Sequence, residues 1–310
     1  MERSWRKAVL VAVAAAAGLC LAWWLARVRP PSAASAGKGP EPGRGSYSFR
    51  RIVCMSPAVT EIVFAAGAGD RVVGVSQHAK WPPEALAKPS CGGFFNPSFE
   101  RIMSLSPDLI IAQGEAADLG EFARAYGIEL RLLELRNLDS ILAAIGRVGE
   151  LLEREAQAEL VAAEMRYRLA KVRARVSDKP PVGVLLVTGR EPGSLSNVYT
   201  VGPGTFLHDL LRVAGGRNVF ADLPRDYAAI NKEAIIERRP EVIVELHGEG
   251  GDRQAARREV RQLWKGMPAL PAVWQGRVHV VTATYAMVPG PRVVRLAESL
   301  AEVLHGEGEP

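Results

Sequence analysis

The chain has 310 residues and is 48% hydrophobic, which allows globular structure in two domains. Its net charge of +5 is modest for this length, and segments such as RRPEVIVE mix arginine with glutamate. A nucleic-acid-binding surface would instead gather basic residues on one face with aromatic residues between them. We therefore expect a solvated surface of mixed charge and no nucleic-acid partner.

Three cysteines are too few for a disulfide-dense fold or a structural zinc site. Cys54 lies at the end of a predicted strand, and Cys91 lies just before the segment GGFFNPSFERI. In an oxidising compartment these two thiols could pair. As two small buried apolar residues they would stay unpaired. Both interpretations are open from the sequence alone.

Residues 1–29 comprise a basic segment and an apolar run, residues 8–26, that is 19 residues long. A transmembrane helix needs about 20 apolar residues, so the run predicts a membrane anchor, or else a signal sequence cleaved near the small residues 34–36. The slight basic excess before the run favours a cytoplasmic N-terminus and an exported body. Residues 30–46 are rich in Pro, Gly and Ser and predict a linker. We expect a periplasmic or extracytoplasmic protein, tethered to the cytoplasmic membrane by residues 8–26.

Residues 47–137 alternate strands with helices, which predicts an α/β lobe with a parallel sheet. The strand RIVCM leads into a helix that Ser56 caps and Pro57 starts. The segment NPSFERIMSLSP is expected to begin a second helix at its asparagine and proline, with Glu100 in the first turn. The apolar strand DLIIA follows, as in a buried parallel sheet.

Residues 178–310 repeat this alternation and predict a second parallel α/β lobe. Glu100 and Pro107 recur as Glu233 and Pro240, each 133 positions further on. Each proline ends its helix, and a β-branched strand follows, DLIIA in one half and EVIVEL in the other. The segments AGAGDRVV and VAGGRNVF form a second, weaker match. Two matches in the same order indicate an internal repeat.

Residues 138–177 lie between the two lobes, contain no proline and carry apolar residues at near-helical spacing. This pattern predicts one long connecting helix. At about 1.5 Å per residue, such a helix would span roughly 55–60 Å. That length is enough to run behind both lobes and tie them together.

The motifs of common enzyme sites are absent from the sequence. It has no phosphate-binding GxxxxGK[ST] segment, no HExxH and no CxxC, and both GAGDRV and GPGTFL lack the third glycine of the dinucleotide-binding motif. The five histidines do not cluster along the chain. We therefore expect no catalytic residues, no cofactor and no metal held by protein side chains alone.

Six segments of the body carry a family resemblance when they are taken in order: RIVCMSPAVTEIVFAAGAGDRVVGVS, WPPEA, GGFFNPSFERIMSLSPDLIIA, GPGTFLHDLLRVAGGRNVF, INKEAIIERRPEVIV and GRVHVVTATYAMVPGPR. Over residues 50–305 the chain resembles the periplasmic substrate-binding proteins of cobalamin and ferric-siderophore importers. The resemblance implies two α/β lobes joined by a long backbone helix. It further implies a monomer that carries a metal chelate, a cobalamin-like corrinoid or a ferric siderophore, to the membrane subunits of an ABC importer.

The resemblance also implies functional residues. In this family one Glu on each lobe docks on arginines of the membrane subunits, and the matching positions are Glu100 and Glu233. The family's ligand lies in the cleft between the lobes, where aromatic rings offer a bulky chelate a large and stiff contact surface. The candidate ligand contacts are Trp81, Phe94, Phe95, Asn96 and Gln113 on the first lobe, and Tyr199, Tyr227 and Tyr285 on the second.

Three alternatives stay open. A haem receptor needs an axial tyrosine or histidine; relatives often have a tyrosine where Phe94 and Phe95 stand here, although Tyr227 or His78 could ligate. A free-metal receptor would need converging histidine and carboxylate ligands, often with a His-rich loop that this sequence lacks. A membrane-tethered sensory domain without a transporter would have no use for either docking glutamate.

Overall fold

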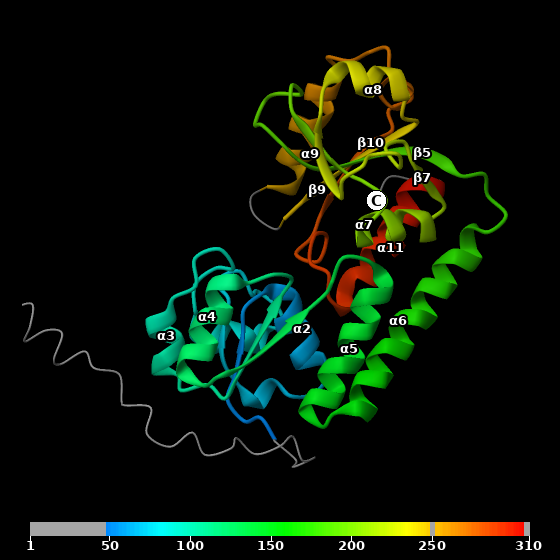
Figure 1. The fold of residues 1–310 in the computed structure, drawn as a ribbon. Helices are drawn as coiled ribbons and strands as arrows, with labels where there is room; N and C mark the ends of the chain where they lie inside the picture. Colours follow the sequence, from blue (N-terminus) through cyan, green and yellow to red (C-terminus); the bar gives the residue numbers. More distant parts are fainter. Residues whose placement is uncertain (1–47, 249–251, 307–310) are drawn as a thin grey trace, which may run out of the picture. The chain divides into compact units, whose positions relative to one another are not determined.

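The computed structural model describes residues 48–248 and 252–306, and Figure 1 shows their helices and strands. The apolar run at residues 8–26 lies outside these ranges, so the anchor or signal sequence stays a prediction. Among the helices of the described ranges, none combines the length and the apolar character that crossing a membrane requires.

The N-terminal sheet has four strands in the order β2-β1-β3-β4, and every pair in it is parallel. The strand residues 52–54 and 109–112 are buried, as expected for branched aliphatic strands covered on both faces. The first predicted parallel sheet is confirmed. Its elements are β1 (Ile52–Cys54), α2 (Pro57–Ala65), η1 (Gly69–Arg71), β2 (Val72–Val75), η2 (Pro83–Ala87), α3 (Phe99–Ser104), β3 (Leu109–Gln113), α4 (Ala117–Tyr126) and β4 (Glu129–Leu133).

Two predicted helix starts have different outcomes. Ser56 caps α2, because its side chain accepts a hydrogen bond from the Val59 amide at 3.2 Å, and Pro57 is the first helical residue. Helix α3, however, begins at Phe99, so the predicted start at the Asn-Pro pair is wrong. Pro97 instead forms an antiparallel bridge with Gly92, which holds the chain extended up to Ser98.

The predicted single helix over residues 138–177 is wrong. The segment forms α5 (Leu138–Leu152) and α6 (Glu155–Val176), which pack side by side in Figure 1. Glu153 adopts a left-handed conformation with φ of 56°, and the Arg154 amide bonds back to the Gly149 carbonyl at 2.8 Å. This is the hydrogen bond of a Schellman helix end. Glycine usually marks such an end, and Glu153 stands in its place, so the usual sequence sign of this turn is missing.

The two helices approach each other closely at Gly149. A Cβ atom at this position would lie 2.5 Å from the Cβ of Ala158 on α6. Glycine therefore lets α6 fold back against α5. Helix α6 alone has 22 residues and spans about 33 Å, rather than the length expected for one continuous helix.

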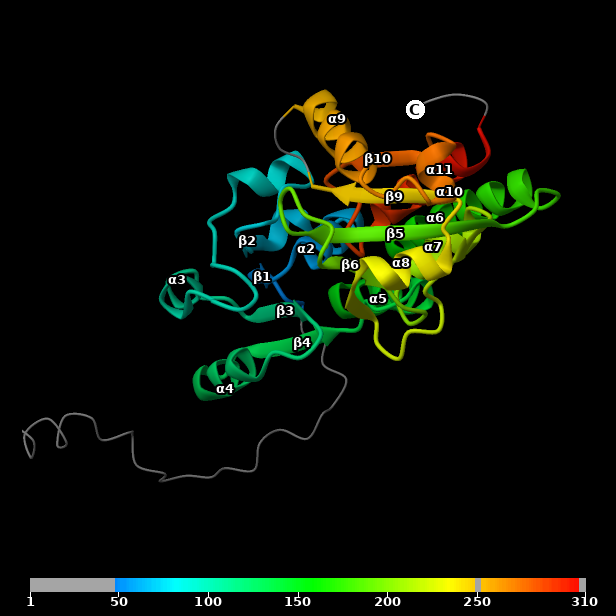
Figure 2. The same ribbon diagram turned by 90° about the horizontal axis from the view of Figure 1, so that it is seen from above.

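The C-terminal sheet is mixed, so the prediction of a second parallel sheet is only partly right. Strands β10, β9 and β5 are parallel neighbours, as Figure 2 shows, whereas β6 is antiparallel to both β5 and β8. Only residues 191–197 connect β5 to β6, and a parallel pair would need a crossover of about a dozen residues. The elements are β5 (Val182–Arg190), β6 (Val198–Val201), α7 (Phe206–Val213), β7 (Gly216–Asn218), β8 (Tyr227–Ile230), α8 (Lys232–Arg238), β9 (Val242–His247), α9 (Arg253–Trp264), α10 (Pro271–Trp274), β10 (Val278–Thr282), η3 (Pro291–Val293) and α11 (Val294–His305).

One hydrophobic cluster joins the two halves. It contains Ile145 of α5, Met165 of α6 and Leu300 of α11 together with residues of both sheets, such as Ile111 and Leu186. Residues 48–310 accordingly cluster as a single unit, and the lobe boundaries at 47–137 and 178–310 stay predictions.

Cys54 and Cys91 are both buried free thiols, so the unpaired interpretation holds in this structure. Burial raises the pKa of Cys91 to about 11. Burial likewise raises the pKa of Cys54. Both thiols are therefore protonated at neutral pH and pack as small apolar groups.

Candidate functional site

A concave site lies where strands of both sheets end. One cavity of about 350 Å³, the first cavity, is lined by residues that follow β1, β9 and β10, among them Pro57, Gly248 and Ala283. A second cavity of about 390 Å³ begins at Gln113, the last residue of β3. Met287 lines both, so the two cavities adjoin, and together we call them the cleft. The carboxyl ends of parallel strands are the usual ligand-binding edge of α/β sheets.

Arg292 forms the charged centre of the first cavity. Its Nη2 and Nε donate to the two carboxylate oxygens of Glu61 at 2.6 and 3.1 Å, and its Nη1 donates to Thr284 at 2.9 Å. The Trp81 ring lies 4.7 Å from the guanidinium carbon and the Tyr285 ring lies 5.9 Å from it, as in cation–π contacts. The guanidinium is thus satisfied before any ligand arrives.

Glu61 lies on α2 and is only 4% exposed, so its charge is almost removed from water. Burial raises the pKa of its carboxyl, and the hydrogen bonds from Arg292 oppose that rise. A buried charge of this kind must be paired to be tolerated. The pair joins α2 of the N-terminal half to η3 of the C-terminal half and sets one wall of the cleft.

The second cavity is richer in acidic groups. Arg136 donates from Nε and Nη2 to one oxygen of Asp226 at 3.0 and 2.7 Å, which joins the segment after β4 to the segment before β8. Glu115 and Glu134 also line this cavity, so its carboxylates outnumber its single arginine. Tyr227 completes the wall; burial first and the Asp226 charge second raise the pKa of its hydroxyl.

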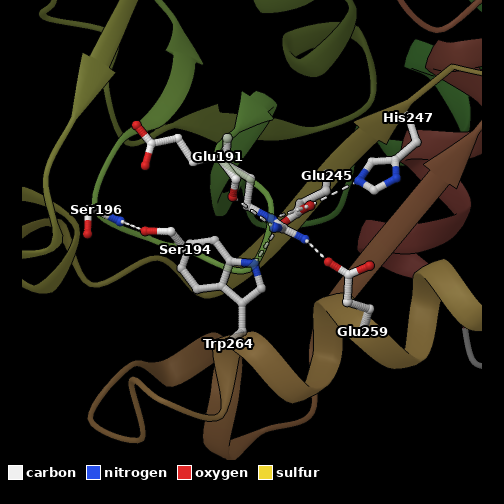
Figure 3. Close-up of polar contacts among 8 residues, drawn as sticks. Glu191, Ser194, Ser196, Glu245, His247, Glu259 and Trp264 are labelled. Atoms are coloured by element: carbon white, nitrogen blue, oxygen red, sulfur yellow. Dashed lines mark hydrogen bonds and ion pairs between the residues drawn. The ribbon is translucent and has the colours of Figure 1, made fainter.

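A buried polar cluster supports the end of β9, as Figure 3 shows. The Glu245 carboxylate accepts hydrogen bonds from Trp264 Nε1 at 2.6 Å, His247 Nε2 at 3.0 Å and Arg190 Nε at 3.1 Å. Burial tends to raise the pKa of Glu245, but these donors together hold it below its ordinary value. The hydrogen bond to Glu245 positions His247, and the adjoining Gly248 lines the first cavity.

The chain is similar to known proteins over most of its length. Residues 52–284 match a family model described as periplasmic binding protein. The chain belongs to this family. The vitamin B12-binding protein of Photorhabdus laumondii subsp. laumondii is 28% identical over 260 residues, which are 83% of this chain and 89% of that protein.

Solved structures share the fold. The periplasmic vitamin B12 binding protein of Vibrio cholerae is 25% identical, with a TM-score of 0.71 over 83% of this chain and 97% of that one. A periplasmic heme binding protein of Pseudomonas aeruginosa is also 25% identical, with a TM-score of 0.71 over 84% of this chain and 95% of that one. The family resemblance found in the sequence is confirmed at this level.

The structure of this binding protein brings some of the predicted ligand contacts together and leaves others apart. Trp81 lines the first cavity, Gln113 and Tyr227 line the second, and Tyr285 lies beside Arg292. The remaining four line neither cavity of the cleft: Phe94, Phe95, Asn96 and Tyr199. Phe95 is 95% exposed, and its ring makes an edge-to-face contact with Phe94, with 5.1 Å between the ring centroids.

Sequence reasoning missed the charged residues of the cleft. Glu61, Arg292, Arg136 and Asp226 were not among the candidates, although the first two lie inside quoted family segments. One signal was available: Glu61 interrupts the apolar run PAVTEIVFA, and a charge on a buried helix face requires a partner. Which arginine supplies that partner depends on tertiary contacts across 231 positions.

Glu100 and Glu233 occupy equivalent places in the two halves of the binding protein. Each lies in the first turn of a short helix, α3 or α8, and each side chain is exposed. Within the described part of the chain, neither carboxylate has a hydrogen bond or ion pair. No group of three or more His, Cys, Asp or Glu residues in the described ranges is arranged to hold a metal ion.

Proposed function

We propose that this binding protein captures a metal chelate in the cleft and delivers it to an ABC importer. The observation that carries the proposal is the pair of adjoining cavities, which residues of both sheets line and which Met287 connects. Trp81 offers a broad aromatic face at one end, while polar groups such as Gln113 line the other. An aromatic face combined with placed polar groups suits a large organic ligand.

A cobalamin-like corrinoid is the first choice of ligand, and a ferric siderophore is the second. The vitamin B12-binding relatives support the first choice. The second cavity adds a physical argument, because Glu115, Glu134 and Asp226 outnumber Arg136 there. Such a wall accepts amide donors and repels polyanionic chelates, so an uncharged chelate edged with amides fits better than a polyanionic siderophore.

Haem is the alternative ligand with an observation in its favour. His78 lines the first cavity, and its Nε2 lies 2.9 Å from the side-chain amide of Gln77. An imidazole in a ligand cavity can serve as an axial haem ligand. The similar structure of a heme binding protein is a second reason to consider haem as the ligand.

Delivery would use Glu100 and Glu233, one on each half, as the contacts with two membrane subunits of the importer. Their exposure and their lack of partners in the described chain leave both charges available to basic groups of another protein. We further propose a monomer of two lobes, residues 47–137 and 178–310, that residues 8–26 tether to the outer face of the cytoplasmic membrane.

The chelate proposal is tested by purifying the full chain from its native membrane and identifying any captured ligand. Mass spectrometry and absorbance should reveal one intact corrinoid, or failing that one ferric siderophore. Recovery of haem would select the alternative ligand. Recovery of a bare metal ion with no organic component would contradict the proposal.

A further inference from the structure

Helices α3 and α8 each expose an apolar side chain beside the carboxylate assigned to docking. Met103 is 37% exposed and Ile236 is 48% exposed. These residues stand three positions after Glu100 and Glu233, so the internal repeat relates them as it relates the glutamates. Single exposed apolar residues are common on protein surfaces. Two of them at equivalent positions, each next to an unpaired carboxylate, form a pattern that is not explained by the folding of this chain.

On each of the two helices, the glutamate and the apolar residue lie on the same outer face. Ile102 on α3 and Ile235 on α8 are both 0% exposed, and each fixes which face of its helix points into the core. At about 100° per residue, positions three apart lie roughly 60° from each other around the axis and are surface neighbours. Glu100 and Met103 therefore share one outer face of α3, and Glu233 and Ile236 share the corresponding face of α8.

We propose that each of these helices makes a two-part contact with the importer, in which the apolar side chain shields the ion pair made by the neighbouring glutamate. The proposal rests on the docking role proposed above. The matching site on each membrane subunit would be a basic side chain beside an apolar hollow. The basic side chain would pair with the glutamate, and the apolar hollow would receive Met103 or Ile236.

The physical reason lies in the weakness of exposed ion pairs. An ion pair that stays in water changes a binding constant by less than about fivefold. Apolar neighbours that exclude water around a central contact raise its contribution, as the rims of binding hot spots do. In the free protein the exposed apolar area at these sites is small, because each helix exposes only one large apolar side chain beside its glutamate.

The test measures the affinity of the full chain for the importer's membrane subunits held in lipid nanodiscs. Met103→Gln and Ile236→Gln keep a helix-compatible side chain of similar length but remove the apolar end. We expect each change to weaken docking about tenfold, and the pair of changes to weaken it further. Leu160→Gln is the matched control, because Leu160 is 65% exposed on α6 and should leave the affinity unchanged.

Salt dependence separates this inference from the proposed docking role. Glu100→Ala and Glu233→Ala should weaken docking and also reduce its salt dependence, whereas the two Gln variants should weaken docking with the salt dependence intact. If the Ala variants weaken docking and the Gln variants do not, the docking role stands and this inference is wrong. If the Ala variants also have no effect, the docking role itself fails. Self-association of the chain that the Gln variants abolish would assign these side chains to a second copy and overturn the inference.

Discussion

At the scale of single residues, the cleft separates groups that hold the protein together from groups that are free for a ligand. The guanidinium of Arg292 donates hydrogen bonds to Glu61 and Thr284, and that of Arg136 donates to Asp226. Trp81 lines the first cavity and is 38% exposed, so part of its surface is open to a ligand. We therefore expect the aromatic surface, more than the arginines, to determine how tightly a chelate binds.

Replacing Trp81 with Ala tests this expectation. Loss of an aromatic anchor in a binding site usually costs about 1–3 kcal/mol, so chelate affinity should fall by that amount. The free energy of unfolding should change little, because the ring is 38% exposed. Titration calorimetry with the captured chelate measures the first quantity, and thermal unfolding measures the second. Trp274→Ala is the control, since Trp274 is exposed and lies outside the cleft. A large loss of stability with unchanged affinity would assign Trp81 to packing instead.

Glu245 links pH to stability. Its pKa is lowered in the folded protein, so the folded state binds fewer protons than the unfolded state as the carboxyl titrates. Its contribution to stability is fully present above its unfolded pKa of about 4.3, and is lost as the pH falls through the lower folded pKa.

Glu245→Gln should therefore destabilise the protein most at neutral pH. Removing one charge from this buried cluster leaves Arg190 without its main partner, and we expect a loss of about 3 kcal/mol at pH 7. The difference from the wild type should shrink as the pH falls below about 4.3, where the unfolded wild-type carboxyl takes up a proton, and it should disappear once the folded carboxyl is also protonated at a lower pH. Urea unfolding at pH 7 and pH 3.5 measures both values. Glu259→Gln, at the exposed rim of the cluster, should cost less than about 1 kcal/mol, and equal losses for the two variants would show that burial is not the cause.

At the scale of elements, the turn between α5 and α6 shows what a sequence pattern can miss. The apolar periodicity predicted helix throughout residues 138–177, and nearly all of them are helical. The reversal at Glu153 depends on a non-glycine residue in a left-handed conformation, which ordinary turn signals do not mark. Gly149 was the available clue, because a glycine inside a helix often reflects close packing.

Two glycines of α5 give opposite predictions for the same substitution. Gly149→Ala should destabilise the protein by about 1–3 kcal/mol, because the new methyl group would overlap Ala158. Gly146→Ala should stabilise it by about 0.5–1 kcal/mol, because a Cβ there meets nothing within 4 Å and alanine favours the helix. Urea unfolding of both variants provides the measurement. If Gly149→Ala were as stable as Gly146→Ala, the close approach of the two helices would be contradicted.

At the scale of the whole molecule, the internal repeat was the most informative part of the sequence. It predicted α3 with β3 and α8 with β9 at matching positions, and the structure contains both pairs. The two segments of the weaker repeat also share a structural feature, because Gly67 and Gly215 follow their helices with φ of 78° and 77°, although the two glycines stand one position apart in the matched segments. Local pattern thus identified the elements, since periodicity and turn chemistry act over a few residues.

The cleft was harder to predict because it is assembled from distant parts of the chain. The contact of Trp81 with Arg292 and that of Arg136 with Asp226 each join residues that lie far apart in the sequence. Aromatic composition pointed to Trp81, which lines the first cavity, and also to Phe95, which lines neither cavity. The direction of β6 was missed for a related reason, since a short connection decides it rather than the strand's own residues.

The central claim is that the cleft binds an intact metal chelate. Equilibrium titration of the full chain with cyanocobalamin, a ferric hydroxamate, haemin and free ferric and cobalt ions tests it most directly. The account predicts saturable one-to-one binding of one chelate, cyanocobalamin first, and at least tenfold weaker binding of the free ions. Equal or tighter binding of a free ion, or saturation by none of the chelates, would contradict it.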